Sequence, residues 1–164
     1  MVRSADVQTF QIREASPEDI PRIMMINRIC LPENYTFFFF ESILRSYPKS
    51  FLIAEVNGEI AGYIMCRVEW TLSKFEKLGF KKVGHIISIA ILPEYRRRGL
   101  AKLLLENALR VLKEEYGCEE AYLEVRVSNS AAISLYEKCN FTTMKVSKGY
   151  YLDGEDAYIM ARKL

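Results

Sequence analysis

The sequence predicts an α/β fold in which one mixed sheet carries helices on both faces. Residues 50–56 and 59–70 flank Asn57–Gly58, a strong short signal for a β-hairpin. The run "VGHIISIAIL" at 83–92 is apolar and rich in β-branched residues, which is typical of a central strand buried on both faces. An amphipathic helix at 97–116 and another strand follow it. Hairpins need antiparallel pairing and β-α-β units need parallel pairing, so one mixed sheet is the simplest solution.

The first third of the chain predicts a strand and two helices. Residues 8–14 form the expected strand. The first helix is expected to begin at Ser16, a suitable cap, with a proline in its first turn and Asp19 placed to complete a capping box. Pro32 ends this helix, because proline cannot continue one. The second helix is expected at 36–46.

The rest of the chain predicts alternating strands and helices. Residues 71–82, between two strands, are expected to form a polar loop or a short helix. The helix at 97–116 has an apolar stripe that docks it on the sheet, and Gly117 ends it. The stripe consists of Leu100, Leu103, Leu104, Ala108, Val111 and Leu112. The last elements are a strand at 119–127, a short helix at 128–139, and a strand pair at 141–151 and 156–164.

The composition is that of an ordinary globular chain. Its 164 residues, half of them hydrophobic, fit one domain that spans 1–164. The 23 basic and 21 acidic residues leave a net charge of +2, without the broad basic field of a dedicated nucleic-acid binder. We find no signal peptide and no membrane-spanning run, so we expect a cytoplasmic protein. The cysteines are widely spaced and are expected to be reduced core residues. They are Cys30, Cys66, Cys118 and Cys139.

The stretch "YRRRGLAKLLLENAL" at 95–109 places three arginines at the start of a predicted helix. Positive charge at this end opposes the helix macrodipole, and the first amides of a helix have no internal partners. Gly99 and Ala101 have little or no side chain, so a ligand could approach the backbone closely. A bound phosphate fits this arrangement, and a solvated basic turn is the plainer interpretation. The pattern is neither a P-loop nor the dinucleotide-binding fingerprint.

The segment Arg96-Arg97-Arg98-Gly99-Leu100-Ala101 resembles the R/Q-x-x-G-x-G/A signature of the GNAT acetyltransferases. Four longer segments resemble the catalytic subunits of NatA-type protein N-terminal acetyltransferases, above all the archaeal single-chain forms. The segments are "LPENY" at 31–35, "GHIISIAILPEYRRRGLA" at 84–101, "LEVRVSNSAAISLYEKCNF" at 123–141 and "YYLDGEDAYIM" at 150–160. The resemblance covers residues 10–163 and is weakest at 71–82. It implies the GNAT fold, a mixed, mostly antiparallel seven-stranded sheet with about four helices on both faces.

The resemblance implies a binding site for acetyl-coenzyme A. The amides at the helix start are implied to hold its pyrophosphate, and the strand before them is implied to pair with its pantetheine arm. The expected cofactor contacts are Ile89, Ala90, Ile91, Arg96, Arg97, Arg98, Gly99, Leu100, Ala101, Lys102, Asn129, Tyr136, Glu137 and Lys138. Alanine replaces the second glycine of the motif at position 101, which the signature allows.

The resemblance also implies where the N-terminus of a protein substrate binds. The expected substrate contacts are Leu31, Glu33, Tyr35, Arg126, Tyr150 and Tyr151. Among them, Arg126 is expected to orient Glu33 or Tyr151. A carboxylate at Glu33 attracts the substrate ammonium and makes the pocket polar. We therefore expect Ser, Ala, Thr or Gly as preferred first residues, with weaker activity on Met.

Acetyl transfer to an amine needs a group that removes a proton. The pKa of an α-amino group is about 8, against about 10.4 for lysine, so a modest base acting through water suffices at a protein N-terminus. The candidates are Glu33, His85 and Glu124; a solvated loop acid and a structural histidine are the plainer interpretations. A carboxylate in the apolar stretch around Glu124 needs a partner, so a His85–Glu124 pair that holds a water meets both needs. By the resemblance, Tyr136 donates a proton to the departing thiolate.

Three functions remain in competition. The leading hypothesis is a protein N-α-acetyltransferase in which the amine attacks acetyl-coenzyme A directly. The alternatives are a GNAT enzyme that acetylates a small amine or a lysine, and a coenzyme-A-binding subunit that has lost catalysis. We expect no required metal, because two ligands, His85 and Glu124, do not make a dedicated site. The expected partners are protein N-termini, with the ribosome or an auxiliary subunit as further candidates, and neither nucleic acid directly nor a membrane.

Overall fold

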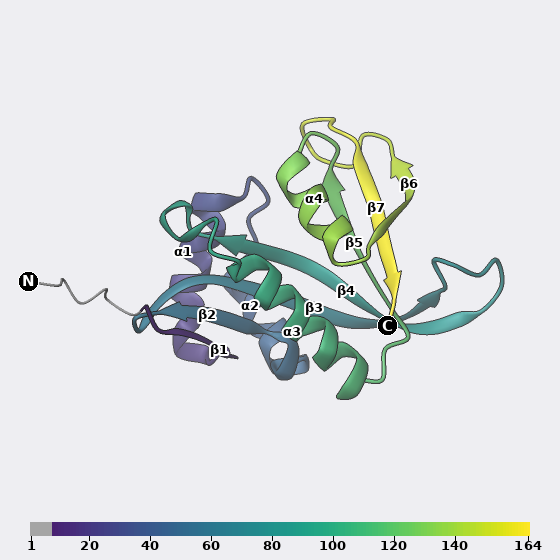
Figure 1. The fold of residues 1–164 in the computed structure, drawn as a ribbon. Coiled ribbons are helices and arrows are strands. Elements are labelled where there is room, and N and C mark those ends of the chain that lie inside the picture. Colours follow the sequence, from purple (N-terminus) through teal and green to yellow (C-terminus); the bar gives the residue numbers. More distant parts are fainter. Residues whose placement is uncertain (1–7) are drawn as a thin grey trace, which may run out of the picture.

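The structure is a computed structural model that describes residues 8–164, and these residues form one seven-stranded sheet. The strand order is β1-β2-β3-β4-β5-β7-β6 (Figure 1). The strands are β1 Phe10–Glu14, β2 Leu52–Val56, β3 Glu59–Leu72, β4 Phe80–Ile91, β5 Glu120–Arg126, β6 Thr142–Ser147 and β7 Ala157–Lys163. Only β4 and β5 pair in parallel within residues 8–164, and the other neighbours are antiparallel. The predicted mixed, mostly antiparallel sheet is confirmed.

Four α-helices in the described part of the chain cover both faces of this sheet, as predicted. They are α1 Ile20–Cys30, α2 Phe37–Ser46, α3 Leu100–Glu114 and α4 Ser130–Lys138. One apolar core lies under α1 and α2 and includes Ile23, Phe40 and Tyr63. A second core lies under α3 and α4 and includes Leu104 and Tyr136. Figure 1 shows these two pairs of helices on opposite sides of the strands.

Two local predictions from the sequence are confirmed in detail. Asn57 and Gly58 have positive φ angles of 50° and 81°, as a tight hairpin turn between β2 and β3 requires. The carboxylate of Asp19 accepts a hydrogen bond from the amide of Ser16 at 2.8 Å, which is the acidic half of the capping box. This box closes a short 3-10 turn, so α1 itself begins at Ile20.

The prediction of a loop or short helix at 71–82 is wrong at both ends of that segment. Strand β3 continues to Leu72, which pairs with Phe80 at the start of β4. Figure 1 shows the resulting hairpin projecting beyond the rest of the sheet. The amide of Lys74 donates to the carboxylate of Glu120 at 2.7 Å and so fastens the turn to β5. A projecting two-stranded ribbon is solvated on both faces, so its sequence lacks the apolar alternation that marks a strand.

Helix α3 starts later and faces the sheet differently than expected. The three arginines precede the helix, which begins at Leu100. Leu103 is 39% exposed and does not belong to the buried stripe. Leu105 and Leu109 are buried instead. Consecutive leucines at 103–105 allow several helical stripes, so spacing alone could not select the one that faces the sheet.

The two parallel strands stay together for only three residues. Strands β4 and β5 pair at Val83, Gly84 and His85 and diverge beyond them. The divergence accompanies a bulge at Ile87, which has no partner in the β3–β4 register. Figure 1 shows β5 turning away from β4 beyond this point. The opening between the strands lies at the carboxyl end of β4, directly before α3.

The second β-α-β unit does not form a parallel pair. Strands β5 and β6 were expected to be neighbours, but β7 lies between them and pairs antiparallel with both. Because β6 and β7 are linked by a hairpin connection, β7 can run back between β5 and β6 and form backbone hydrogen bonds with both strands. The strands β5, β7 and β6, with α4, thus form a group set apart from β1–β4 (Figure 1).

Candidate active site

A cavity of about 1440 Å³ lies where β4 and β5 diverge. It is bordered by the α1–α2 connection, β4, the start of α3, the end of β5, α4 and the β6–β7 connection. All four side chains predicted to be catalytic line it, and they are Glu33, His85, Glu124 and Tyr136. The predicted substrate contacts also line it, and they are Leu31, Glu33, Tyr35, Arg126, Tyr150 and Tyr151. Segments far apart in the sequence therefore meet in one hollow.

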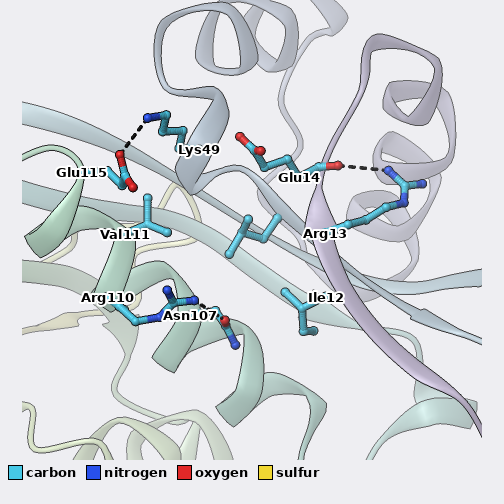
Figure 2. A pocket seen from close by; sticks show the side chains of 9 residues that line it. Ile12, Arg13, Glu14, Lys49, Asn107, Arg110, Val111 and Glu115 are labelled. Atoms are coloured by element: carbon cyan, nitrogen blue, oxygen red, sulfur yellow. Dashed lines mark hydrogen bonds and ion pairs between the residues drawn. The ribbon is translucent and has the colours of Figure 1, made fainter.

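A smaller cavity of about 440 Å³ lies between β1, the turn Pro48–Ser50 and α3 (Figure 2). Several of its polar side chains bind one another: Lys49 Nζ lies 2.7 Å from Glu115 Oε2, and Arg110 donates to Asn107 at 2.9 Å. None of the residues predicted from the sequence to be functional lines this cavity. The larger cavity is therefore the candidate active site.

The predicted phosphate-binding stretch forms a tight loop at one end of the large cavity. Arg97 and Gly99 have left-handed φ angles of 62° and 78°, and Gly99 is the N-cap of α3. The guanidinium of Arg96 donates to the carbonyl oxygen of Ile91 at 2.8 Å, which fixes the loop against β4. A Cβ at Gly99 would meet nothing within 4 Å, so the space beside the backbone is open. Arg97 and Lys102 line the cavity beside the first turn of α3, whose amides have no partners within the helix.

Two of the predicted cofactor contacts lie outside the cavity. Arg98 donates to Gln8 at 2.8 Å and to the carbonyl oxygen of Glu94 at 3.1 Å, so its guanidinium braces the loop from outside. Glu137 lies on the exposed face of α4. Helical geometry turns it away from its buried neighbour Tyr136. The other predicted contacts line the cavity, and they are Ile89, Ala90, Ile91, Arg96, Arg97, Gly99, Leu100, Ala101, Lys102, Asn129, Tyr136 and Lys138.

Strand β4 presents an edge to the cavity that no other strand covers beyond His85 within residues 8–164. Backbone amide and carbonyl groups on such an edge can pair with an extended ligand. Gly62 of β3 stands opposite Ile91, and a Cβ there would come within 2.5 Å of the carbonyl oxygen of Ala90. Glycine at this position therefore lets β4 lie where its free edge borders the cavity.

Helix α4 forms the opposite wall. The side chain of Asn129 caps the helix by accepting a hydrogen bond from the amide of Ala132 at 3.2 Å. Tyr136 is buried against Phe141, and its hydroxyl has no hydrogen-bond partner among residues 8–164. Burial raises the pKa of Tyr136 well above the ordinary tyrosine value, so its hydroxyl keeps its proton at neutral pH.

Arg126 links the two loops on the other side of the cavity. It donates to Glu33 of the α1–α2 connection at 2.5 Å. It also donates to Asp153 at 2.8 Å and to Glu155 at 3.0 Å, both in the β6–β7 connection. Its guanidinium lies 4.0 Å over the ring of Tyr151. The sequence expectation named Glu33 or Tyr151 as the neighbour of Arg126, and the structure places it against both.

A series of hydrogen-bonded, buried polar side chains anchors the "LPENY" segment to the sheet. Asn27, in the last turn of α1, donates to the carbonyl oxygen of Glu33 at 3.1 Å and to the hydroxyl of Tyr63 at 3.1 Å. The same hydroxyl lies 2.6 Å from Oγ of Ser88 on β4. Tyr35 stacks on Phe39 at a centroid distance of 4.8 Å. These contacts fix the loop that carries Glu33 relative to the sheet.

His85 is held between two carboxylates. Its Nδ1 lies 2.9 Å from Oε2 of Glu69, and its Nε2 lies 2.7 Å from Oε2 of Glu124. The imidazole also stacks on the ring of Tyr122 at a centroid distance of 4.2 Å. The side chains of the predicted pair thus touch directly. The second oxygen of Glu124, Oε1, has no hydrogen-bond partner within residues 8–164, so it is the atom open to a water or an amine.

Sequence reasoning missed the residues behind His85. Glu69 accepts hydrogen bonds from Tyr122 at 2.5 Å and from Arg67 at 2.6 Å, in addition to its contact with the imidazole. Burial alone would raise the pKa of Glu69, but these donors and His85 lower it below the ordinary glutamate value. The signal was the pair of charged residues at alternate positions in an apolar strand, which places Arg67 and Glu69 on one face.

Two further observations concern the chain as a whole. All four cysteines are free, as predicted, and three of them are buried whereas Cys30 borders the large cavity. In the part of the chain that the structure describes, no helix is long and apolar enough to cross a membrane. Within the same residues, no group of three or more His, Cys, Asp or Glu side chains is arranged to hold a metal ion.

Residues 18–141 match the Acetyltransferase (GNAT) family, and the chain belongs to this family. It is 52% identical over 156 residues to the N-alpha-acetyltransferase of Saccharolobus solfataricus. The aligned region covers 94% of this chain and 93% of the relative. It is 37% identical to the catalytic subunit NAA10 of the N-terminal acetyltransferase A complex of Arabidopsis thaliana, over 93% of this chain and 77% of the relative. Within the family, the chain is an acetyltransferase of the N-alpha type.

Solved structures agree with this placement. Ard1 from Thermoplasma volcanium superposes with a TM-score of 0.81 at 30% identity, over 94% of this chain and 97% of that chain. The NatC complex bound to Gag peptide and CoA contains a chain that superposes with a TM-score of 0.84 at 28% identity, over 94% of this chain and 98% of that chain. The expected GNAT fold is confirmed.

Proposed function

We propose that this protein moves the acetyl group of acetyl-coenzyme A to the α-amino group at the N-termini of other proteins in the cytoplasm. One observation carries the proposal. A single cavity has an arginine loop and a free helix start at one end, and a carboxylate bound to Arg126 at the other, with His85 and Glu124 between β4 and β5. An anionic donor and a cationic acceptor can thus enter from opposite sides.

The residues present fit acetyl-coenzyme A. Arg97, Lys102 and the first amides of α3 would hold its phosphates, where the open space at Gly99 lets them approach the backbone. The uncovered edge of β4 at 89–91 would pair with the amide groups of its pantetheine arm. When bound, the cofactor supplies the acetyl group as a thioester.

The acceptor side is built for a positively charged amine. Glu33 attracts the α-ammonium group, and Arg126 fixes the orientation of the carboxylate. The free oxygen of Glu124 takes the proton, directly or through a water, and the hydroxyl of Tyr136, which lines the cavity, returns a proton to the departing thiolate. No covalent acetyl-enzyme is needed, because a neutral amine is itself a competent nucleophile.

We further propose a preference for small first residues. Leu31, Glu33 and Tyr35 line the pocket with Tyr150 and Tyr151, so a charged carboxylate stands among the rings that would surround the first side chain. Ser, Ala, Thr and Gly fit such a pocket, and Met is acetylated more slowly. The presence of a complex among the structural neighbours supports an auxiliary subunit as a partner. The ribosome is the other partner that we propose.

A peptide panel tests the activity. The protein is incubated with acetyl-coenzyme A and peptides that begin with Ser, Ala, Met or Glu, and with an N-blocked peptide that has an internal lysine. Mass spectrometry should locate the acetyl group on the α-amine, fastest for Ser and Ala. Acetylation of the lysine alone would assign the protein to the side-chain or small-amine acetyltransferases. Cofactor binding without turnover on any peptide would mark it as a non-catalytic subunit.

A further inference from the structure

A charged chain of side chains runs behind the proposed proton acceptor. It starts at Arg67 on β3, continues through Glu69 and His85, and ends at Glu124 on β5. The imidazole is 10% exposed, and the carboxylates of Glu69 and Glu124 are 22% and 16% exposed. These groups are thus mostly withdrawn from water, where each donor and acceptor needs a partner.

The hydrogen-bond pattern of Glu69 identifies it as an ionised acceptor. Its two oxygens receive the hydroxyl of Tyr122 at 2.5 Å and the Nε–H of Arg67 at 2.6 Å. An arginine has no lone pair to offer, so the carboxylate must accept from it. The third contact, at 2.9 Å from Nδ1 of His85, is therefore also a donor facing the same anion. Glu69 thereby places a proton on Nδ1.

The opposite nitrogen meets a second carboxylate. Nε2 lies 2.7 Å from Oε2 of Glu124, within hydrogen-bond distance. With Nδ1 already protonated, a neutral His85 would aim the lone pair of Nε2 at this carboxylate. A doubly protonated ring donates at both ends and satisfies both anions. The charge of the group Glu69–His85–Glu124 is then −1.

We propose that Glu69 is a positioning residue that keeps His85 as an imidazolium cation, so that Glu124 rather than His85 accepts the proton from the substrate amine. This inference rests on the proposed function. The proton that leaves the amine goes to Oε1 of Glu124, while the Nε2–H of His85 remains hydrogen-bonded to Oε2. The role of Glu69 corresponds to that of the buried aspartate in a Ser-His-Asp triad, which fixes the histidine and stabilises its charged form.

Charged and titratable side chains approach the imidazole from β3, from β5 and from the β3–β4 turn. Arg67 and Glu69 approach it from β3, and Tyr122 and Glu124 from β5. Lys74, from the β3–β4 turn, lies 4.3 Å over the ring of Tyr122. Burial raises the pKa values of Tyr35 and Tyr150, and the nearby charge of Glu124 raises them further. Both hydroxyls therefore stay neutral near pH 7. Glu69 is the anion that contacts Nδ1.

The only histidine of the chain makes the protonation state directly measurable. In the protein labelled with 15N, the side-chain spectrum reports both ring nitrogens without assignment by mutation. At pH 7 the wild type should show both nitrogens protonated. Glu69→Gln removes the anion, so the imidazolium should lose its proton at lower pH than in the wild type. A neutral ring in the wild type at pH 7 would overturn the proposal, whatever the enzyme's activity.

Tyr122→Phe separates electrostatics from damage to the fold. It keeps the stacked ring but removes one donor from Glu69, so more of the carboxylate charge acts on His85. The titration of His85 should then move to higher pH, opposite to its movement in Glu69→Gln. If both substitutions merely loosened the site, the titration of His85 would move in the same direction in Tyr122→Phe and Glu69→Gln. That result would overturn the proposal.

Kinetics give the functional readout. In Glu69→Gln, kcat on a Ser-starting peptide should fall about tenfold, because a displaced base loses part of its usual contribution. The alkaline limb of the pH profile of kcat, where the imidazolium loses its proton, should shift to lower pH, and KM should change little. Glu55→Gln is the matched control, since Glu55 lies on β2, is similarly buried and pairs with Arg13 at 2.8 Å, away from His85. An unshifted pH profile in Glu69→Gln, or the same shift in Glu55→Gln, would refute the positioning role.

Discussion

At the residue scale, Glu33 and Glu124 border the same cavity but have chemically different partners. Glu33 is bound to Arg126, which keeps its charge at every physiological pH. Glu124 is bound through one oxygen to His85, which Glu69 holds from the other side of the ring, and its second oxygen has no partner within residues 8–164. A carboxylate held by a permanent cation is suited to attract an ammonium group. One with a free oxygen beside the cavity is better suited to take up a proton.

Replacing Glu33 tests the first of these roles. In Glu33→Ala, Arg126 would lose a 2.5 Å partner and would present a less compensated positive charge to the substrate ammonium. We expect kcat/KM to fall about tenfold or more on Ser- and Ala-starting peptides, and less on Met-starting ones, whose larger side chain adds apolar contact. Steady-state kinetics on the three peptides measure this. Glu33→Gln keeps an acceptor for Arg126 and should lose less, and equal losses on all peptides would contradict the assignment.

The pair His85 and Glu124 should behave as one unit. Because their side chains touch at 2.7 Å, removing either one disables the same function. We expect the double variant His85→Ala, Glu124→Ala to be slower than each single variant. The loss should remain far smaller than the product of the two single losses. Single-turnover rates of the four proteins give the coupling. Losses that multiply would mean independent roles, and wild-type rates in the double variant would remove both residues from the reaction.

At the element scale, local signals predicted local structure. The turn at Asn57–Gly58 and the acidic half of the capping box at Ser16 depend on neighbouring residues and could be recognised in the sequence. The order of β5, β7 and β6 depends on which edges meet in space, and no short motif encodes this. The stripe of α3 was ambiguous for the same reason, since adjacent leucines offer several faces to the sheet.

The same contrast explains what was found of the site. The loop with Gly99 and the segment with Glu33 lie in contiguous motifs, so the resemblance led to them directly. Glu69 reaches His85 only through the register of the long β3–β4 hairpin, and the sequence predicted both strands but not that they pair or which of their residues stand opposite. Arg98 has the same motif and chemistry as its neighbours, yet the turn of the backbone directs it to Gln8 outside the cavity. Side-chain direction in a tight loop cannot be derived from residue type.

The loop before α3 should be sensitive to backbone strain. Gly99 has a φ of 78°, so Gly99→Ala costs about 1 kcal/mol in backbone conformation, and the added Cβ, which meets no protein atom within 4 Å, would occupy the space proposed for the phosphates. We expect coenzyme A to bind more weakly, with a dissociation constant several-fold larger, as measured by calorimetry. Gly58→Ala is the matched control, with a φ of 81° and equally open space in the β2–β3 turn. It should lower the melting temperature similarly but leave the dissociation constant unchanged; weaker binding in both variants would contradict a local effect.

At the scale of the whole molecule, partly buried ion pairs connect segments that lie far apart in the sequence. Arg126 on β5 joins the β6–β7 connection, through Glu155, to the α1–α2 connection, through Glu33. Arg13 on β1 joins Asp19, before α1, to Glu55 on β2. The contact of Arg126 with Glu33 crosses between segments that do not pair in the sheet, whereas Arg13 ties Asp19 to the paired strands β1 and β2. The stability of the whole protein should therefore depend on pH through these carboxylates.

Acid should destabilise the protein in a defined range. The hydrogen bond from Arg13 lowers the pKa of Asp19 below its usual 3.8, and the hydroxyl and amide of Ser128, with Arg126, lower that of Glu155 below 4.5. A carboxyl whose pKa is lower in the folded protein binds protons more readily when unfolded. Its stabilising contribution is complete above the unfolded pKa and disappears as the pH falls through the folded one. The free energy of unfolding should thus decline below about pH 5, as these carboxylates take up protons.

Urea denaturation between pH 7 and 3 measures this decline, and two variants identify its source. Asp19→Asn removes one of the groups with a lowered pKa, so it should be less stable than the wild type at pH 7 and should lose less stability on acidification. Glu59→Gln changes an exposed carboxylate that has no ion pair within residues 8–164, so it should follow the wild-type curve. If Asp19→Asn declines as steeply as the wild type, protonation of the linking carboxylates does not cause the loss. Acid would then act through the general rise in positive charge, which added salt should relieve.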